Sequence, residues 1–299
     1  MRRLVLLATV ALLAGCATTE YVFHHAFPTL EIHRHDGGYL YESKPAGRDT
    51  VVIWLSGGRL GSVLGTNNEG RVRGGGFWSA LYEFGDAMTV VAPERPNARP
   101  GTDHEFDDVF LRSYTIDNLV AEYARMIDHY LDRNRTENVY MMGRSEGSLV
   151  LPAVYLSLEN KERIDRMVSL FGGGMSPPEY YRIDNDLGPG EHFELWWQRV
   201  EENPDSIEHA YHRLTYRYLT SWLGNSPLDA YRRIDVPVLF VHGMEDTRVP
   251  VQSTQVVESE LPEKPFEYWY AEDMGHGPAT REESIALLER IETWLLQDE

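Results

Sequence analysis

The chain has 299 residues, of which 42% are apolar and 25% are charged. This length and composition predict one large globular domain with room for an insertion, and they favour two independent domains less. The formal net charge at pH 7 is −19, from 28 basic and 47 acidic residues, and lysine and arginine form no stripe after the first few positions. The charge therefore argues against nucleic acid as a partner, and against electrostatic attraction to anionic lipids or substrates.

The first residues have the pattern of an export signal. A short basic start, Met1-Arg2-Arg3, precedes an apolar stretch over residues 4–13, and small residues follow. Such a stretch is too short for a permanent membrane-spanning helix and is typical of a secretory signal peptide. We expect the protein to be exported.

The end of this segment, Leu13-Ala14-Gly15-Cys16, resembles the lipobox of bacterial lipoproteins. The resemblance implies that the signal peptide is residues 1–15, that Cys16 is lipidated, and that the lipid anchors the protein to a membrane of the bacterial cell envelope. Ala17 in place of an aspartate resembles the outer-membrane sorting pattern. Cleavage would remove two arginines and no acids, giving a mature charge of −19 − 2 = −21. The alternative is an ordinary signal peptide that is cut nearer Ala17.

Cys16 is the only cysteine, so the folded body offers no disulfide, thiol nucleophile or cysteine-based zinc site. Residues 16–50 are polar and aromatic with two glycine or proline turn signals, and they predict a tether followed by a peripheral hairpin.

Two histidines in this hairpin, His33 and His35, would share one strand face and could bind a metal ion together with His24 or His25. No framework of acids or cysteines supports such a site. We therefore predict no metal.

Short, nearly continuous apolar runs recur along the rest of the chain and predict strands that are buried on both faces. These runs are residues 51–55, 88–92, 139–142, 166–171, 236–241 and 266–270. Helical patterns lie between or after them, at residues 115–133, 148–160, 250–261 and 282–296. The alternation predicts an α/β fold with a mostly parallel central sheet flanked by helices.

One predicted strand leads into Gly143-Arg144-Ser145-Glu146-Gly147, and a helical pattern follows. A serine on a tight strand-to-helix turn stands clear of the sheet, as a nucleophile requires, and the amide of Glu146 points to where an oxyanion would form. The glycines allow the strand and the helix to approach closely. If the Glu146 carboxylate is buried it needs a partner, and we expect Arg59 or Arg144.

Residues 175–232 break the rhythm of strands and helices, because they contain no apolar strand-like run but hold Trp196, Trp197 and Trp222 with several tyrosines. We interpret them as an inserted helical cap. Its aromatic rings either pack the cap onto the core or line a substrate pocket, and both can hold together.

A serine hydroxyl needs a base and an orienting carboxylate before it can act as a nucleophile. His276 follows the last predicted strand between two glycines, and Asp246 follows the preceding strand. Open α/β sheets place their chemistry at these carboxyl ends. Glu245 and Asp273 are rival candidates for the acid.

The order serine, acid, histidine resembles that of α/β-hydrolase fold serine hydrolases, with the core at residues 51–174 and 233–299. The resemblance implies Ser145 as nucleophile, His276 as general base, Asp246 as orienting acid, and the amides of Gly58 and Glu146 as the oxyanion hole. It implies no cofactor. Ser56 replaces a histidine that is usual in this loop, which affects its geometry but not the backbone donors.

The predicted activity is hydrolysis of a carboxylic ester through an acyl-enzyme intermediate. The partners would be a small-molecule ester, thioester or amide and, through Cys16, a membrane. A proline-iminopeptidase-like aminopeptidase or a thioesterase is the alternative, and the Gly-Gly pair with the cap resembles the former. A non-catalytic lipoprotein that uses the fold as a binding module is the alternative of another class.

Overall fold

The computed structural model describes most of the chain after the predicted signal segment, namely residues 30–43, 49–58, 61–66, 72–73, 77, 80–81, 84, 87–101, 107–183, 192–211 and 214–297. The predictions for residues 1–29, including Cys16, His24 and His25, fall outside these ranges. In the described ranges, no helix combines the length and the apolar character needed to cross a membrane.

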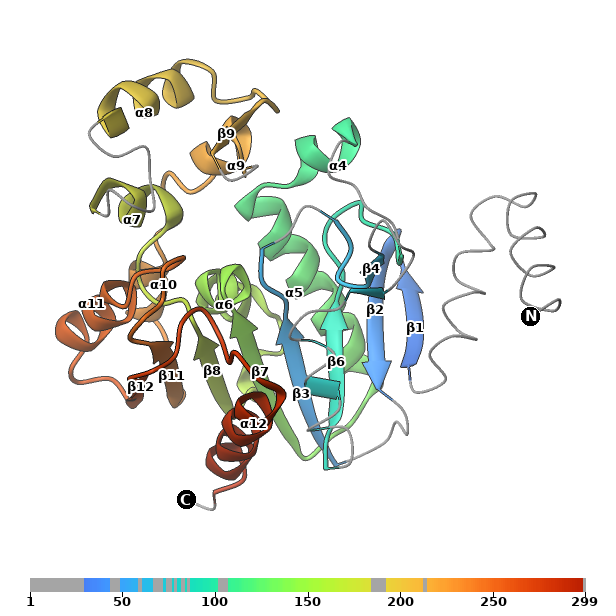
Figure 1. Cartoon of the computed structure of the whole chain (residues 1–299). Coiled ribbons are helices and arrows are strands. Elements are labelled where there is room, and N and C mark those ends of the chain that lie inside the picture. The colour runs from blue at the N-terminus through green and yellow to red at the C-terminus, as the bar shows by residue number, and fades with distance from the viewer. Residues whose placement is uncertain are drawn as a thin grey trace, which may run out of the picture.

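The centre of the molecule is an eight-stranded sheet in the order β1-β2-β6-β3-β7-β8-β11-β12 (Figure 1). Its strands are β1 (Leu30–His35), β2 (Gly38–Ser43), β3 (Thr50–Leu55), β6 (Thr89–Pro93), β7 (Asn138–Arg144), β8 (Arg166–Leu170), β11 (Val238–Gly243) and β12 (Phe266–Ala271). Six neighbouring strands of this sheet, β6, β3, β7, β8, β11 and β12, are parallel, whereas β1 and β2 extend one edge in antiparallel fashion. The hairpin near the N-terminus is therefore part of the main sheet.

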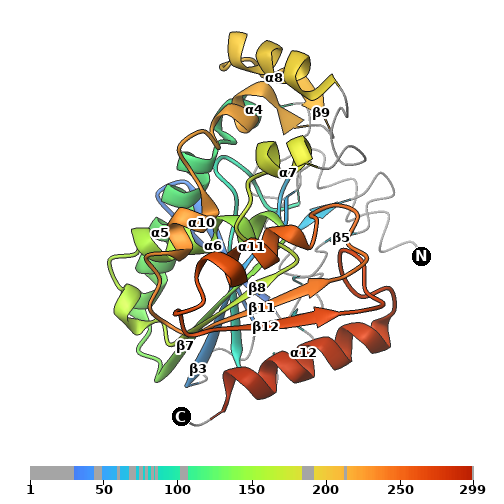
Figure 2. The same cartoon turned by 90° about the vertical axis from the view of Figure 1, so that its left-hand side faces the viewer.

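Helices cover both faces of this sheet. In β3, the buried side chains alternate: Val51 and Ile53 pack with helices α5 (Ile116–Arg133) and α6 (Glu146–Ser157), and Val52 and Trp54 pack with α12 (Arg281–Leu295). Figure 2 shows α12 along one side of the sheet. A strand that is buried on both faces explains why its sequence is a continuous apolar run.

The segment after β8 lies at the side of the sheet toward which β7 and β8 point (Figures 1 and 2). It contains α7 (Pro177–Ile183), α8 (Phe193–Glu202), β9 (His209–Tyr211), β10 (Leu214–Thr215), α9 (Tyr216–Thr220) and α10 (Pro227–Tyr231). The expectation of a segment without strands is wrong in one respect, because β9 and β10 pair in antiparallel fashion. Strands of three and two residues are too short to produce an apolar run.

Aromatic rings in this segment pack against one another. Trp197 is 5% exposed, and its ring stacks on Phe193 with 6.0 Å between centroids. Trp222 is also buried and meets the ring of Tyr218 edge to face. These contacts support the interpretation that the aromatic residues pack the segment together.

The remaining described elements are small. They are the pair β4 (Gly65–Thr66) and β5 (Val72–Arg73), helix α4 (Asp108–Ser113), the 3-10 turn η1 (Lys161–Arg163) and helix α11 (Gln252–Glu260).

Candidate active site

Ser145 lies on a sharp turn between β7 and α6, with a φ of 55° and a ψ of −120°. A side chain on either flanking glycine would collide with backbone: a Cβ on Gly143 would lie 2.3 Å from the Gly147 carbonyl oxygen, and one on Gly147 would lie 2.1 Å from that of Leu55. The Ser145 amide donates to the carbonyl of Leu170, at 2.8 Å. The turn thus forces the backbone of a non-glycine residue into the left-handed region, where it is strained.

The structure brings together the three side chains that the sequence singled out. His276 Nε2 lies 2.8 Å from Ser145 Oγ, and His276 Nδ1 lies 2.8 Å from Asp246 Oδ2. Asp246 follows β11 and His276 follows β12, so both come from carboxyl ends of strands. This chain of hydrogen bonds allows a proton to pass from the serine to the imidazole while the carboxylate fixes the tautomer.

The Asp246 carboxylate is buried, and both of its oxygens accept hydrogen bonds. Its Oδ1 accepts from the amides of Arg248 (2.8 Å) and Val249 (3.1 Å). Burial alone would raise the pKa of Asp246, but hydrogen bonds from His242 and His276 hold this pKa well below its usual range. The rival acids Glu245 and Asp273 are exposed.

His242 also contacts the Asp246 carboxylate. It is fully buried, its Nδ1 lies 2.7 Å from Thr254 Oγ1, and its Nε2 lies 3.0 Å from the Val249 carbonyl oxygen and 3.4 Å from Asp246 Oδ2. It therefore contacts Asp246 and not Ser145.

The surroundings of the His276 imidazole favour its neutral form. Burial lowers the pKa of His276 below its ordinary value, and the positive charges of Arg144 and Arg248 act in the same direction. The Asp246 carboxylate opposes them. Arg144 also donates from its guanidinium to the His276 carbonyl oxygen, at 2.9 Å, which ties the histidine loop to the serine turn.

The two predicted oxyanion residues lie against each other. A Cβ on Gly58 would lie 3.2 Å from Glu146 Cβ, and one on Gly57 would lie 3.2 Å from Ser145 Cβ. Glu146 is the first residue of α6, so its amide has no carbonyl partner within the helix. The buried hydroxyl of Ser56 has no hydrogen-bond partner among the described residues.

The Glu146 carboxylate is buried, but its partners differ from those expected. It accepts hydrogen bonds from the hydroxyls of Tyr114 and Tyr218, each at 2.5 Å. Arg144 does not pair with it, and Arg59 lies outside the described residues. The prediction of an arginine partner at 144 is wrong, because that guanidinium turns toward the histidine loop.

Sequence reasoning also missed Arg95, which is 2% exposed. Its guanidinium donates to the carbonyl oxygens of Gly57 and Gly61, the latter at 3.2 Å. Its neighbour Glu94 is fully buried and accepts from Tyr41 at 2.6 Å. The available signal was a charged pair directly after a buried strand, at the same sheet edge as the serine.

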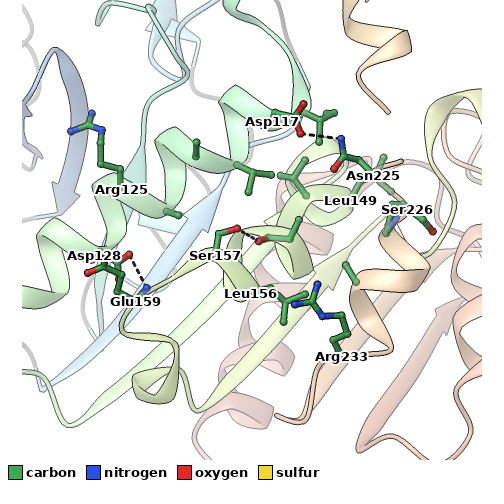
Figure 3. A pocket seen from close by; sticks show the side chains of 18 of the residues that line it. Asp117, Arg125, Asp128, Leu149, Leu156, Ser157, Glu159, Asn225, Ser226 and Arg233 are labelled. Atoms are coloured by element: carbon green, nitrogen blue, oxygen red, sulfur yellow. Dashed lines mark hydrogen bonds between the residues drawn. The ribbon is translucent and has the colours of Figure 1, made fainter. Parts of the chain in front are cut away.

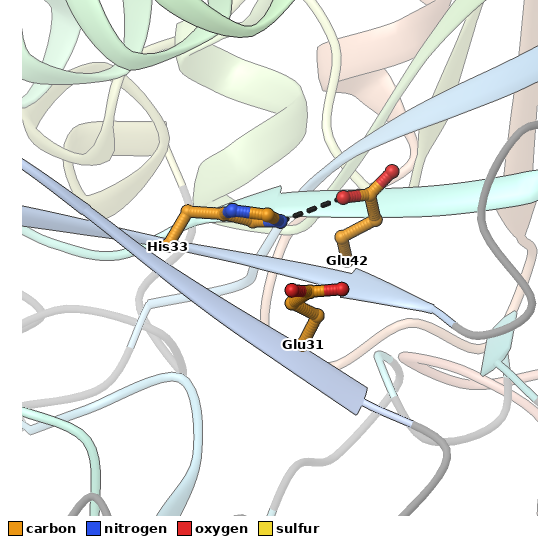
Figure 4. A group of neighbouring side chains, drawn as sticks. All are labelled: Glu31, His33 and Glu42. Atoms are coloured by element: carbon orange, nitrogen blue, oxygen red, sulfur yellow. Dashed lines mark hydrogen bonds and ion pairs between the residues drawn. The ribbon is translucent and has the colours of Figure 1, made fainter.

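One cluster in the described ranges has the residue types of a metal site (Figure 4). One ligand atom from each of Glu31, His33 and Glu42 lies within 4.8 Å of the others. Acids therefore do lie beside His33, contrary to the expectation from the sequence. Hydrogen bonds to Glu42 from His33 (2.6 Å) and Tyr130 (3.0 Å) account for its burial. The second histidine, His35, stacks on His129 instead.

A cavity of about 880 Å³ lies along α5, α6 and α10 (Figure 3). Its lining includes Val120, Leu149 and Leu156 together with charged residues such as Asp128 and Arg233, and none of Ser145, Asp246 and His276. This cavity is therefore separate from the serine site.

Several solved structures share this fold. Est1E from Butyrivibrio proteoclasticus is 14% identical with a TM-score of 0.61, over 90% of this chain and 99% of Est1E. Mouse alpha/beta hydrolase domain-containing protein 10 is 15% identical with a TM-score of 0.61, over 89% and 98%. Pyrococcus horikoshii acylaminoacyl peptidase is 13% identical with a TM-score of 0.59, over 92% of this chain but 42% of that one. The predicted α/β-hydrolase fold is confirmed.

A comparison with curated protein sequences found no match. The sequence does match the prolyl oligopeptidase family over residues 99–298, which is about two thirds of the chain. The matched region contains Ser145, Asp246 and His276, whereas Gly58 precedes it. The chain therefore belongs to the prolyl oligopeptidase family, and it is a member of the serine hydrolase superfamily.

Proposed function

We propose that the protein hydrolyses carboxylic esters with Ser145 as nucleophile, His276 as general base and acid, and Asp246 as orienting carboxylate. The observation that carries the proposal is the pair of 2.8 Å contacts that joins Ser145 Oγ to His276 and His276 to Asp246. The strained turn at Ser145 supports it, because such turns recur at nucleophiles.

In the proposed reaction, Ser145 Oγ attacks the ester carbonyl carbon as His276 Nε2 takes the hydroxyl proton. The carbonyl oxygen becomes an oxyanion between the amides of Gly58 and Glu146. The intermediate then collapses, His276 returns the proton to the departing alkoxide, and an alcohol leaves. Water activated by His276 attacks the acyl-enzyme in the same way, which releases the carboxylic acid and restores the serine.

An ester is preferred over a peptide as substrate because the chain matches small hydrolases over nearly their whole length. It covers 99% of Est1E, which has been solved with bound ferulic acid, but only 42% of the acylaminoacyl peptidase. Membership of the prolyl oligopeptidase family makes a peptidase the second candidate, and the proline-iminopeptidase-like aminopeptidase is one form of it.

An aminopeptidase needs a carboxylate in the cap to hold the substrate's free amine, and the sequence offers Glu191, Glu194, Glu201 and Glu202. Glu194 pairs with Arg182 at 3.2 Å, Glu201 accepts from Trp197 at 2.7 Å, and Glu202 accepts from Gln198 at 2.9 Å. Glu191 lies outside the described residues. Each described acid already has a local partner, which favours the ester over the peptide.

A fluorophosphonate probe tests the proposal on the purified full-length protein. We expect labelling confined to Ser145 by mass mapping, its loss in Ser145→Ala, and faster turnover of p-nitrophenyl esters than of thioesters or aminoacyl anilides. Faster cleavage of the anilides would make the peptidase the better assignment. Failure of the folded protein to react with the probe would favour a non-catalytic binding module.

We also propose that a lipid on Cys16 anchors the protein to the bacterial cell envelope, in the outer membrane. The lipobox-like end of the signal segment and Ala17 support this localisation.

A further inference from the structure

The carboxylate of Glu146 is buried directly beside the reactive serine. The residue is 5% exposed, and each of its oxygens accepts a hydrogen bond from a different tyrosine: Oε1 from Tyr218 and Oε2 from Tyr114, both at 2.5 Å. Hydrogen bonds to a charged acceptor are stronger than neutral ones, and removing one from a buried carboxylate leaves a charge that is poorly compensated.

The two tyrosines belong to different parts of the molecule. Tyr218 is on α9, within the cap beyond the ends of β7 and β8, and Tyr114 ends α4 (Figure 1). Their rings stack with 5.2 Å between centroids and 13° between planes. One carboxylate on the nucleophile helix is thus bonded both to the cap and to the core.

The same side chain forms the surface against which the oxyanion loop rests. A Cβ on Gly58 would meet Glu146 Cβ at 3.2 Å and Cδ at 3.3 Å, so the loop backbone already lies in close contact with this side chain. The loop is also held by Arg95, which donates to the carbonyl oxygens of Gly57 and Gly61. The position of Gly58 therefore depends on where the Glu146 side chain lies.

We propose that Glu146 is a positioning residue that couples the cap to the oxyanion hole. The hydroxyl of Tyr218 holds the carboxylate, the carboxylate side chain sets the position of Gly58, and the amides of Gly58 and Glu146 face the developing oxyanion. A movement of α9 removes one donor and lets the side chain shift. Because oxyanion donors act only when correctly placed, the cap controls the rate of the chemical step through this contact.

This coupling rests on the proposed function, and a purely structural role would have a different signature. If the tyrosines only hold the cap in place, removing a hydroxyl lowers stability and leaves each folded active site as fast as before. If they position the oxyanion hole, removing a hydroxyl lowers kcat and weakens the binding of analogues of the tetrahedral intermediate, while KM changes little.

The test compares Tyr218→Phe, which keeps the ring, with Tyr216→Phe, a variant two residues away in α9. The Tyr216 hydroxyl makes no hydrogen bond to the described residues. Active sites are titrated with the fluorophosphonate, and kcat and KM are measured with a p-nitrophenyl ester. Inhibition by a trifluoromethyl ketone with the same acyl chain reports on the oxyanion hole directly.

We expect Tyr218→Phe to lower kcat about tenfold and to weaken inhibition by the ketone by a similar factor. Both quantities should stay within about twofold of the wild type in Tyr216→Phe. Glu146→Gln should lower kcat as well, and adding Tyr218→Phe to it should have little further effect, because both act through one contact. A Tyr218→Phe protein with a lower melting temperature but unchanged kcat and ketone affinity would overturn the coupling, as would additive losses.

Failure of the proposed function is distinguishable from failure of the coupling. A wild type that reacts with the fluorophosphonate but hydrolyses no ester still tests the coupling, through the labelling rates of the same variants. A folded wild type whose Ser145 is unreactive overturns both.

Discussion

At the scale of the residue, the role proposed for His276 sets two opposite requirements, because a general base has to take a proton from Ser145 and then release it. Burial and the charges of Arg144 and Arg248 favour the neutral imidazole, and Asp246 favours the protonated one. The balance lowers the pKa of His276 below its ordinary value, so the base is ready to accept a proton at neutral pH.

The first prediction concerns Asp246. Asp246→Asn keeps the shape of the side chain but places an amide where the Nδ1–H of His276 donates, which favours the wrong tautomer. We expect kcat for an ester to fall about ten-thousand-fold, as measured by steady-state kinetics on folded protein. The neighbouring exposed acid provides the matched control, and Glu245→Gln should retain wild-type activity. A comparable loss in Glu245→Gln would reassign the orienting acid.

The second prediction concerns pH. Since the protonated imidazole cannot accept the serine proton, kcat/KM should fall as the pH drops through the pKa of His276, which burial places below the ordinary value for histidine. Arg248→Gln removes a charge that disfavours protonation of His276, so the pKa of His276 rises and the acid limb moves to higher pH. The shift should be small, because the Arg248 side chain is exposed and its charge is screened.

The control for Arg248→Gln is Lys161→Gln. Lys161 is an exposed cation that precedes β8, so it lies at the amino end of that strand, whereas Ser145, Asp246 and His276 lie at the carboxyl ends of the strands. The pH profile of this control variant should match that of the wild type. A shift of the acid limb to lower pH in Arg248→Gln would contradict the sign of the effect.

Ser145, Asp246 and His276 could be predicted from the sequence because each lies in a local pattern at the end of a strand. The partners of Glu146 could not be. Tyr114 and Tyr218 are 32 and 72 residues away from it, and nothing in their own neighbourhoods indicates that they meet a carboxylate. Long-range contacts of this kind appear only when the cap is placed on the core.

At the scale of the element, the close approach of α6 to β3 makes a further prediction. A Cβ on Gly147 would lie 2.1 Å from the Leu55 carbonyl oxygen, which is backbone and cannot move aside cheaply. We expect Gly147→Ala to destabilise the protein by roughly 3 kcal/mol or more, or to prevent folding, as measured by thermal melting and soluble yield. In contrast, a Cβ on Gly275 would lie 3.6 Å from its nearest neighbour, which is an ordinary van der Waals contact, so Gly275→Ala should fold. Equal melting temperatures for the two variants would contradict the prediction.

The elements that the sequence predicted are those whose pattern is set by burial. The strands β3, β6, β7, β8 and β11 are buried and form apolar runs within two residues of the predicted bounds, and the edge strand β12, which is only partly buried, was found from its aromatic residues. Strands β9 and β10 were missed because they consist of only a few residues. Their pairing depends on the fold of the cap and not on a local hydrophobic pattern.

At the scale of the whole molecule, the acidic charge makes the proposed membrane association depend on the lipid. A chain with a net charge of −19 is not attracted to anionic lipid, so Cys16 is the feature that would hold it there. We expect Cys16→Ser to move the protein from the membrane to the soluble fraction of fractionated cells. Ala17→Ser, which leaves the thiol in place, should stay with the membrane. Retention of Cys16→Ser in the membrane fraction would refute the anchor.

The positive φ of Ser145 also has a consequence for the stability of the whole protein. A non-glycine residue in such a conformation lowers the free energy of unfolding by about 1 to 3 kcal/mol. Glycine removes this strain, but part of the gain is lost because glycine has greater conformational freedom in the unfolded chain. Ser145→Gly should therefore melt about 2 °C or more above Ser145→Ala, which keeps the Cβ and its strain. Both variants would be inactive. A gain in thermal stability at this one position is thus incompatible with the proposed reaction, and selection for stability alone would replace the proposed nucleophile.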